Sequence, residues 1–130
     1  MRIVQVVPRL PPPAEGVGSY ALELARALAE RHGTETLFHA ASAHPPSHRA
    51  GALEEALEEA RPSAVLLHYV NYGYQQRGCP VWLLHTLRRW RRGGTGRRLV
   101  TVFHEVYATG PPWRSSFWTM PLQRGIAAAM

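Results

Sequence analysis

Three short segments of the sequence carry residue types that could bind or act on a ligand. These residues are Gly16-Val17-Gly18, Tyr72 with Tyr74, and His104-Glu105. Glycines where a helix begins let backbone N–H groups approach a phosphate or a sugar. A histidine can polarise or hydrogen-bond a sugar hydroxyl near neutral pH, and a neighbouring glutamate can orient it. Tyrosine rings can stack on sugar faces, so the three segments together indicate a site for a sugar or a phosphate.

Each segment also has a purely structural interpretation that the residues leave open. The glycines would serve only to start a helix, the histidine would cap a strand end, and the tyrosines would pack within a loop. The run from Gly16 to Ala21 formally matches the dinucleotide fingerprint G-x-G-x-x-A. However, a loop intervenes between the preceding strand and the glycines, and the next strand ends in His39-Ala40 without the acidic residue of that fingerprint. We therefore do not expect a dinucleotide cofactor.

The seven histidines do not form a recognisable metal site in the sequence. His44 and His48 are four residues apart, but Pro45 and Pro46 prevent a helix from presenting them together. No cluster of cysteine and histidine has the spacing of a zinc site. We predict no bound metal ion.

The candidate segments lie at the ends of alternating strands and helices. Strands are expected over 2–7, 34–40, 63–70 and 98–103, helices over 16–33, 50–60, 80–92 and from about 115 onward, and loops over 41–49, 71–78 and 104–113. Such alternation predicts an α/β fold, a Rossmann-like parallel sheet with helices on both faces. Ligands bind at the carboxyl edge of such sheets, which is where the candidate segments would lie.

Two of the expected helices show apolar stripes that should face this sheet. The stripes are Leu53, Ala56, Leu57 and Ala60 in the first, and Leu83, Leu84, Leu87 and Trp90 in the second. Among the later aromatic residues, we interpret Trp113, Phe117 and Trp118 as core or domain-interface residues.

Composition restricts the class of protein. The 130 residues suffice for one domain, numbered 1–130, and its charge is +6. The single cysteine, Cys79, excludes an internal disulfide and favours a reducing cytoplasm. We find neither a signal peptide nor an apolar run long enough to span a membrane.

A basic stretch surrounds Trp90, and it comprises Arg88, Arg89, Arg91 and Arg92. It is either a solvated helix face or a contact for an anionic membrane, because basic residues beside an aromatic suit a headgroup surface. No nucleic-acid motif accompanies it, so we do not expect DNA or RNA as a partner. The cytoplasmic prediction therefore includes a peripheral position at the inner face of the membrane.

Several stretches resemble one enzyme family. MRIVQVVPRLPPPAEGVGSYALELARALAERHG is similar to the opening of GT-B glycosyltransferases of the family 4 type, and LVTVFHE resembles their fourth-strand signature. HYVNYGYQQRGCPVWLL and GPPWRSSFW resemble a subgroup of these enzymes. The resemblance covers nearly the whole chain.

The resemblance implies an acceptor-side domain of a hexosyltransferase that moves a sugar from a nucleotide-sugar to a lipid-linked or polysaccharide acceptor. Gly16 and Gly18, joined by Val17, would approach the donor. His104, beside Glu105, would contact the transferred sugar. Tyr72 and Tyr74 would border the acceptor pocket. The nucleotide-sugar is a co-substrate, and no cofactor or protein-bound metal is implied.

The donor-binding domain of that family is absent from these 130 residues. We therefore expect an incomplete N-terminal half of a GT-B architecture that is inactive by itself, and such a fragment should expose apolar surface over 126–130. The alternative from the residues is a non-catalytic α/β binding or interaction module. The donor sugar, the stereochemistry and the oligomeric state do not follow from the sequence.

Overall fold

The computed structural model describes residues 1–130 except 13–15, 77, 106–112 and 114. The described elements are, in chain order, β1 (Arg2–Val7), α1 (Gly16–His32), β2 (Glu35–Ala40), the 3-10 turns η1 (Ala41–Ala43) and η2 (Pro46–His48), α2 (Arg49–Ala60), β3 (Ala64–Val70), α3 (Asn71–Tyr74), α4 (Val81–Arg92), β4 (Arg98–Glu105) and α5 (Ser115–Ala129). The order alternates between strand and helix as the sequence predicts.

The four strands form one sheet in the order β2-β1-β3-β4, and every pairing is parallel. β1 and β3 lie in the middle, which explains their runs of buried apolar residues. β1 pairs with β2 on one side and with β3 on the other. The chain therefore adds β2 on one side of β1 and then crosses back to add β3 and β4 on the other side, so the strand order switches between β1 and β3. In such folds this point opens a crevice at the carboxyl edge.

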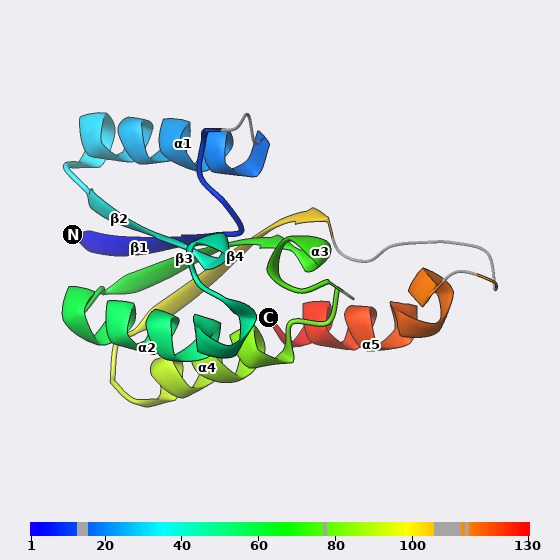
Figure 1. Ribbon diagram of the computed structural model, residues 1–130. Coiled ribbons are helices and arrows are strands. Elements are labelled where there is room, and N and C mark those ends of the chain that lie inside the picture. The colour runs from blue at the N-terminus through cyan, green and yellow to red at the C-terminus, as the bar shows by residue number, and fades with distance from the viewer. Residues whose placement is uncertain (13–15, 77, 106–112, 114) are drawn as a thin grey trace.

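Helices cover both faces of the sheet, which confirms the predicted α/β, Rossmann-like architecture. α1 lies on one face, and α2, α4 and α5 lie on the other (Figure 1). The main hydrophobic core lies on the α2, α4 and α5 side, where Val6, Leu67 and Tyr69 of the sheet are fully buried.

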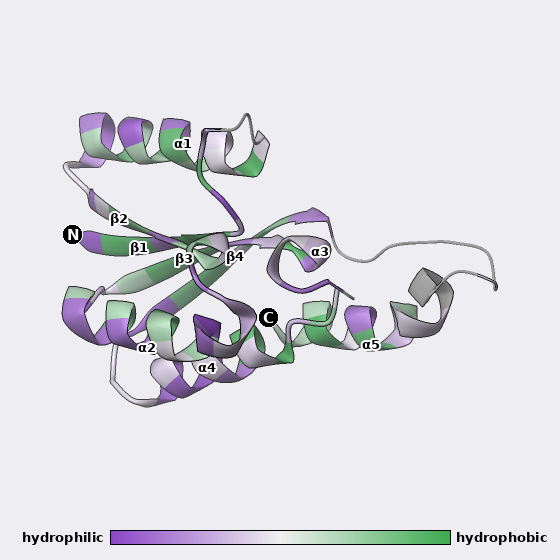
Figure 2. Ribbon diagram, in the orientation of Figure 1, coloured by the Kyte–Doolittle hydropathy of each residue, from purple (hydrophilic) through white to green (hydrophobic). Residues whose placement is uncertain are grey.

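The predicted apolar stripes of α2 and α4 face this core, except that one predicted residue in each helix is not buried. Leu53, Leu57 and Ala60 of α2 are buried, but Ala56 is only partly buried. In α4, Leu83, Leu87 and Trp90 are buried together with Thr86, whereas Leu84 is partly exposed. The stripe of α4 is therefore rotated slightly from the predicted one. Figure 2 shows the long apolar stretches of the strands and the hydrophilic segments along α4.

The predicted loop over 71–78 is wrong in its first half, where α3 forms a single helical turn. Two buried side chains, Asn71 and Tyr74, hold this turn against the sheet. The Asn71 Oδ1 accepts a hydrogen bond from the Tyr72 backbone N–H at 2.8 Å. Asparagine and tyrosine are common in loops, so composition alone favoured the wrong assignment.

The expectation of exposed apolar surface over 126–130 is also wrong. Ile126 and Ala127 are buried in the main core, and Met130 packs against it. α5 lies beside α4, whose Arg88 donates a hydrogen bond to the Ala129 carbonyl oxygen at 3.1 Å. The exposed apolar surface of α5 lies nearer its start, where Trp118 is 74% exposed. Trp113 is 84% exposed, so neither tryptophan belongs to the core; the side chain of Phe117 lies outside the described residues.

Candidate functional site

A pair of histidines forms the centre of the carboxyl edge. His68, near the end of β3, and His104, near the end of β4, stack with ring centroids 5.4 Å apart. The His68 Nδ1 lies 3.1 Å from the His104 Nε2. The His68 ring is fully buried, while His104 is exposed. The pair therefore has one ring fixed in the sheet and one ring that a ligand can reach.

The strand register is irregular at His104. Tyr69 pairs with Phe103 and the next residue, Val70, pairs with Glu105, so His104 is an extra residue without a partner in the ladder. Such bulges redirect side chains and are frequent beside active sites. Phe103 packs edge-on against Tyr69 on the core side, whereas His104 contacts His68 on the α1 side.

Gln5 fixes the orientation of this pair from the neighbouring strand. Its Oε1 lies 2.6 Å from the His68 Nε2, and Gln5 is fully buried. An amide oxygen can only accept, so the His68 Nε2 carries a proton and the His68 Nδ1 accepts one from the His104 Nε2. In neutral His104 the lone pair is then on Nδ1, and this nitrogen can accept a proton from a ligand hydroxyl.

Burial keeps His68 neutral. Burial, and secondarily repulsion by His104, lower the pKa of His68 to about 4. A neutral His68 can accept the proton of His104 throughout the physiological range. The buried ring therefore acts as a fixed acceptor that orients its exposed neighbour.

The start of α1 lies over the two imidazoles. The ring of Tyr20 meets His68 edge-on at 5.8 Å and His104 edge-on at 5.4 Å. Gly16 is the first residue of α1. Val17 is half-buried and Gly18 is buried. A Cβ on Gly16 would meet nothing within 4 Å, so that position has open space for a ligand to approach the backbone. Tyr20, two residues after Gly18, thus places the start of α1 against His104.

Glu105 ends β4 next to His104 and is exposed. Its carboxylate has no hydrogen bond or ion pair with any described residue. The structure places it beside the histidine pair but shows no contact by which it would orient His104, so that role stays a prediction.

The two candidate tyrosines have different environments. Tyr74 is fully buried, and its hydroxyl lies 2.7 Å from the His68 carbonyl oxygen and 3.0 Å from the Val6 carbonyl oxygen. It joins the ends of β1 and β3. Tyr72 is 38% exposed, and its hydroxyl accepts a hydrogen bond from the buried Gln123 at 3.2 Å. Both rings line a cavity on the α2 and α4 side of the edge.

Replacement of Tyr74 by phenylalanine tests its structural role. We expect the free energy of unfolding to fall by about 1–2 kcal/mol, because the ends of β1 and β3 lose a buried hydroxyl hydrogen bond. Urea denaturation measures this change. An unchanged midpoint would show that the hydroxyl does not hold the strands.

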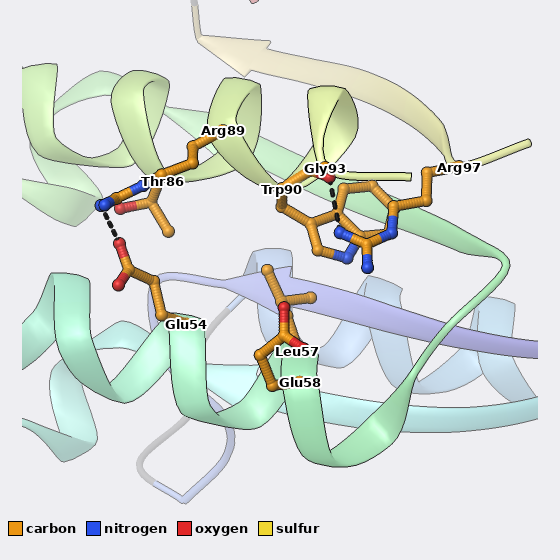
Figure 3. Close-up of a pocket in the computed structure, with 8 residues that line it drawn as sticks. All are labelled: Glu54, Leu57, Glu58, Thr86, Arg89, Trp90, Gly93 and Arg97. Carbon is orange, nitrogen blue, oxygen red and sulfur yellow. Dashed lines mark hydrogen bonds and ion pairs between the residues drawn. The ribbon is translucent and has the colours of Figure 1, made fainter. Parts of the chain in front are cut away.

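A second cavity lies at the opposite end of the sheet, between α2 and α4 (Figure 3). It has a volume of about 340 Å³ and is bounded by Arg97, which precedes β4 directly. Arg89 pairs with Glu54 across its mouth, and Arg97 lies over the Trp90 ring and donates to the Trp90 carbonyl oxygen at 2.7 Å. The carboxylates of Glu54 and Glu58 in its lining offset the charge of its arginines, so we assign the candidate site to the carboxyl edge.

The basic stretch of α4 is exposed, but its aromatic residue is not. Arg88, Arg89, Arg91 and Arg92 face solvent, whereas Trp90 is only 6% exposed and belongs to the core. A membrane contact would therefore rest on charge alone and stays a prediction. In the part of the chain that the structure describes, no helix combines the length and apolarity needed to cross a bilayer.

A second histidine pair lies at the end of β2 and in the segment that follows it. His39, buried in β2, stacks on His44 with centroids 5.4 Å apart. Burial, and secondarily repulsion by His44, lower the pKa of His39 to about 4. Across the described ranges, no three histidine, cysteine or acidic residues gather closely enough to hold a metal ion.

Sequence reasoning missed three residues of the site: Gln5, Tyr20 and His68. The two strand residues break apolar runs, and both occupy positions that alternate toward the α1 face. A polar residue inside a buried strand requires a hydrogen-bond partner, which was the available signal. Tyr20 follows the glycines by two residues and gave no separate signal.

Comparisons of the chain with protein-family models, with curated proteins and with solved structures found no match. The site must therefore be interpreted from its own geometry.

Proposed function

We propose that this chain is the acceptor-side portion of a GT-B glycosyltransferase that transfers a sugar from a nucleotide-sugar to a lipid-linked or polysaccharide acceptor. The observation that carries the proposal is the exposed His104, oriented by the buried His68 and Gln5 at the carboxyl edge beside the start of α1. That edge is where parallel α/β sheets bind ligands.

The arrangement supports three roles. The His104 Nδ1 is available to a sugar hydroxyl, because the Nε2 is engaged by His68. The backbone around Gly16, at the start of α1, can approach an anionic or hydroxyl-bearing part of the donor. The exposed ring of Tyr72 offers a stacking surface at the rim of the adjacent cavity. Donor binding by a second domain would complete the reaction, so we propose that the 130 residues are inactive alone.

The test is sugar transfer by the protein purified from its native source. Nucleotide-sugars with labelled sugars are offered together with lipid and polysaccharide extracts, and label in the product is measured. Incorporation from one donor supports the proposal. Absence of transfer from every donor contradicts it and favours the alternative, a non-catalytic binding module that uses the same edge.

A further inference from the structure

A cavity of about 860 Å³ lies at the carboxyl edge on the side of α2 and α4. The residues that line it include Arg9, Arg49, Tyr72, Gln75, Gln76 and Trp82. Its volume is in the range of small-molecule sites. The lining combines two arginines, several hydrogen-bonding side chains and aromatic rings, and it includes no acidic residue among those described.

Arg49 is held in place at this cavity. Its Nη1 donates to the Tyr74 carbonyl oxygen at 2.7 Å, and its Nε donates to the His44 carbonyl oxygen at 3.2 Å. A guanidinium has five N–H donors, so these two bonds orient the group and leave donors for a ligand. A cation fixed in this way loses little conformational entropy when it binds an anion.

Arg9 supplies a second positive charge at the same cavity. It lies two residues after the end of β1, is exposed, and has no ion pair with any residue that the structure describes. Without an acidic partner in the lining, the two arginines give the cavity a positive potential. Arginine forms strong bidentate bonds with phosphate groups.

The remaining lining indicates what the anion is attached to. Gln75 and Gln76 are exposed amides that can bond hydroxyl groups, and the rings of Tyr72 and Trp82 offer faces for a sugar or polyol ring. We propose that this cavity binds a phosphorylated, hydroxyl-rich small molecule, with Arg9 and Arg49 as the ligands of its phosphate.

The cavity lies at the same carboxyl edge as the histidine pair but on the other face of the sheet, and Tyr74 connects the two because it lines the cavity and bonds the His68 carbonyl oxygen. If the proposed transfer reaction is correct, on which this step rests, the ligand is the acceptor, and its phosphate anchors it at the same carboxyl edge as His104. Binding of the phosphate itself does not depend on that reaction.

The experiment is calorimetric titration of the chain with inorganic pyrophosphate at low ionic strength. We expect saturable binding at one site. Arg9→Gln should weaken it at least about 10-fold, because a charge-assisted bond is lost. Arg49→Lys keeps the charge but removes the planar fork, and should weaken it by about 3-fold or more. Arg31→Gln, an exposed arginine at the far end of α1, is the matched control and should leave the affinity unchanged.

Three further ligands identify the attached group. In the Arg9→Gln variant, glucose 1-phosphate should bind more tightly than pyrophosphate. Glucose, which lacks the phosphate, should not bind. Short-chain phosphatidic acid binding in place of glucose 1-phosphate would overturn the hydroxyl-rich ligand and assign the phosphate to a lipid headgroup.

Absence of saturable pyrophosphate binding, or an equal loss in Arg31→Gln, would overturn the site and leave only diffuse attraction to the net charge of +6. Anion binding without any sugar transfer would reject the proposed function and retain this site. Sugar transfer without anion binding would overturn this site and retain the proposed function.

Discussion

Replacement of His104 by alanine will lower the rate of sugar transfer by the native protein about 100-fold. A positioned histidine that exchanges a proton or hydrogen bond with the reacting sugar contributes an effect of about this size. The labelled-sugar assay measures it. The effect on stability should be small, because the His104 ring is exposed, so that water can replace it as the hydrogen-bond donor to the His68 Nδ1.

His85→Ala is the matched control for this variant. His85 is also exposed, but it lies on α4, away from the carboxyl edge. The His85→Ala variant should transfer sugar at the unaltered rate, and urea denaturation should show that both variants are folded. Full activity in the His104 variant would refute the assignment of the site.

Acid will destabilise the fold through two buried histidines. The pKa of both His39 and His68 is lowered to about 4, in each case first by burial and then by a neighbouring histidine. The unfolded chain binds protons at a pKa of about 6.5, so it holds more protons than the folded chain between these values. Stability is therefore complete above pH 6.5 and declines as the pH falls toward 4.

The expected loss is about 3 kcal/mol for each histidine by pH 4, which is a large part of the stability of a small domain. Urea denaturation at several pH values measures it. His39→Leu should remove about half of the dependence, and it leaves no partner unsatisfied because the His39 Nε2 has no hydrogen bond. His85→Gln controls for loss of a surface histidine. A stability that is flat between pH 6.5 and 4 would contradict the burial of both rings.

The sheet was predictable because its strands have strong patterns. The β-branched run from Arg2 to Val7 matches β1 at both ends, and the other three strands differ by one or two residues. Continuous apolar runs separated by helical stripes admit few arrangements besides a parallel sheet covered on both faces. The expectation that a ligand site lies at the carboxyl edge follows from this architecture.

The errors arose where long-range contacts decide the structure. α3 forms because Asn71 bonds Gln123, a residue 52 positions later, and because Tyr74 bonds the backbone of two strands. Ile126 is buried because α5 packs on the same core as α4. Local composition contains neither of these contacts, so it favoured a loop and an exposed end.

The site was predicted in part for the same reason. His104 and Gly16 were recognisable from their positions at element ends, whereas the pairing of His68 with Gln5 depends on the register of β1 and β3. The bulge at His104 also depends on pairing that the residues alone do not specify. The chemistry of the exposed histidine is therefore set by residues that look like ordinary strand residues in the sequence.

The most direct test of the carboxyl-edge site is an NMR titration of the histidine side-chain signals with nucleotide-sugars and soluble glycans. We expect at least one of these ligands to shift the His104 signal in a saturable manner, while the His85 signal on α4 stays in place. No saturable change at His104 with any ligand, or equal changes at both histidines, would contradict it.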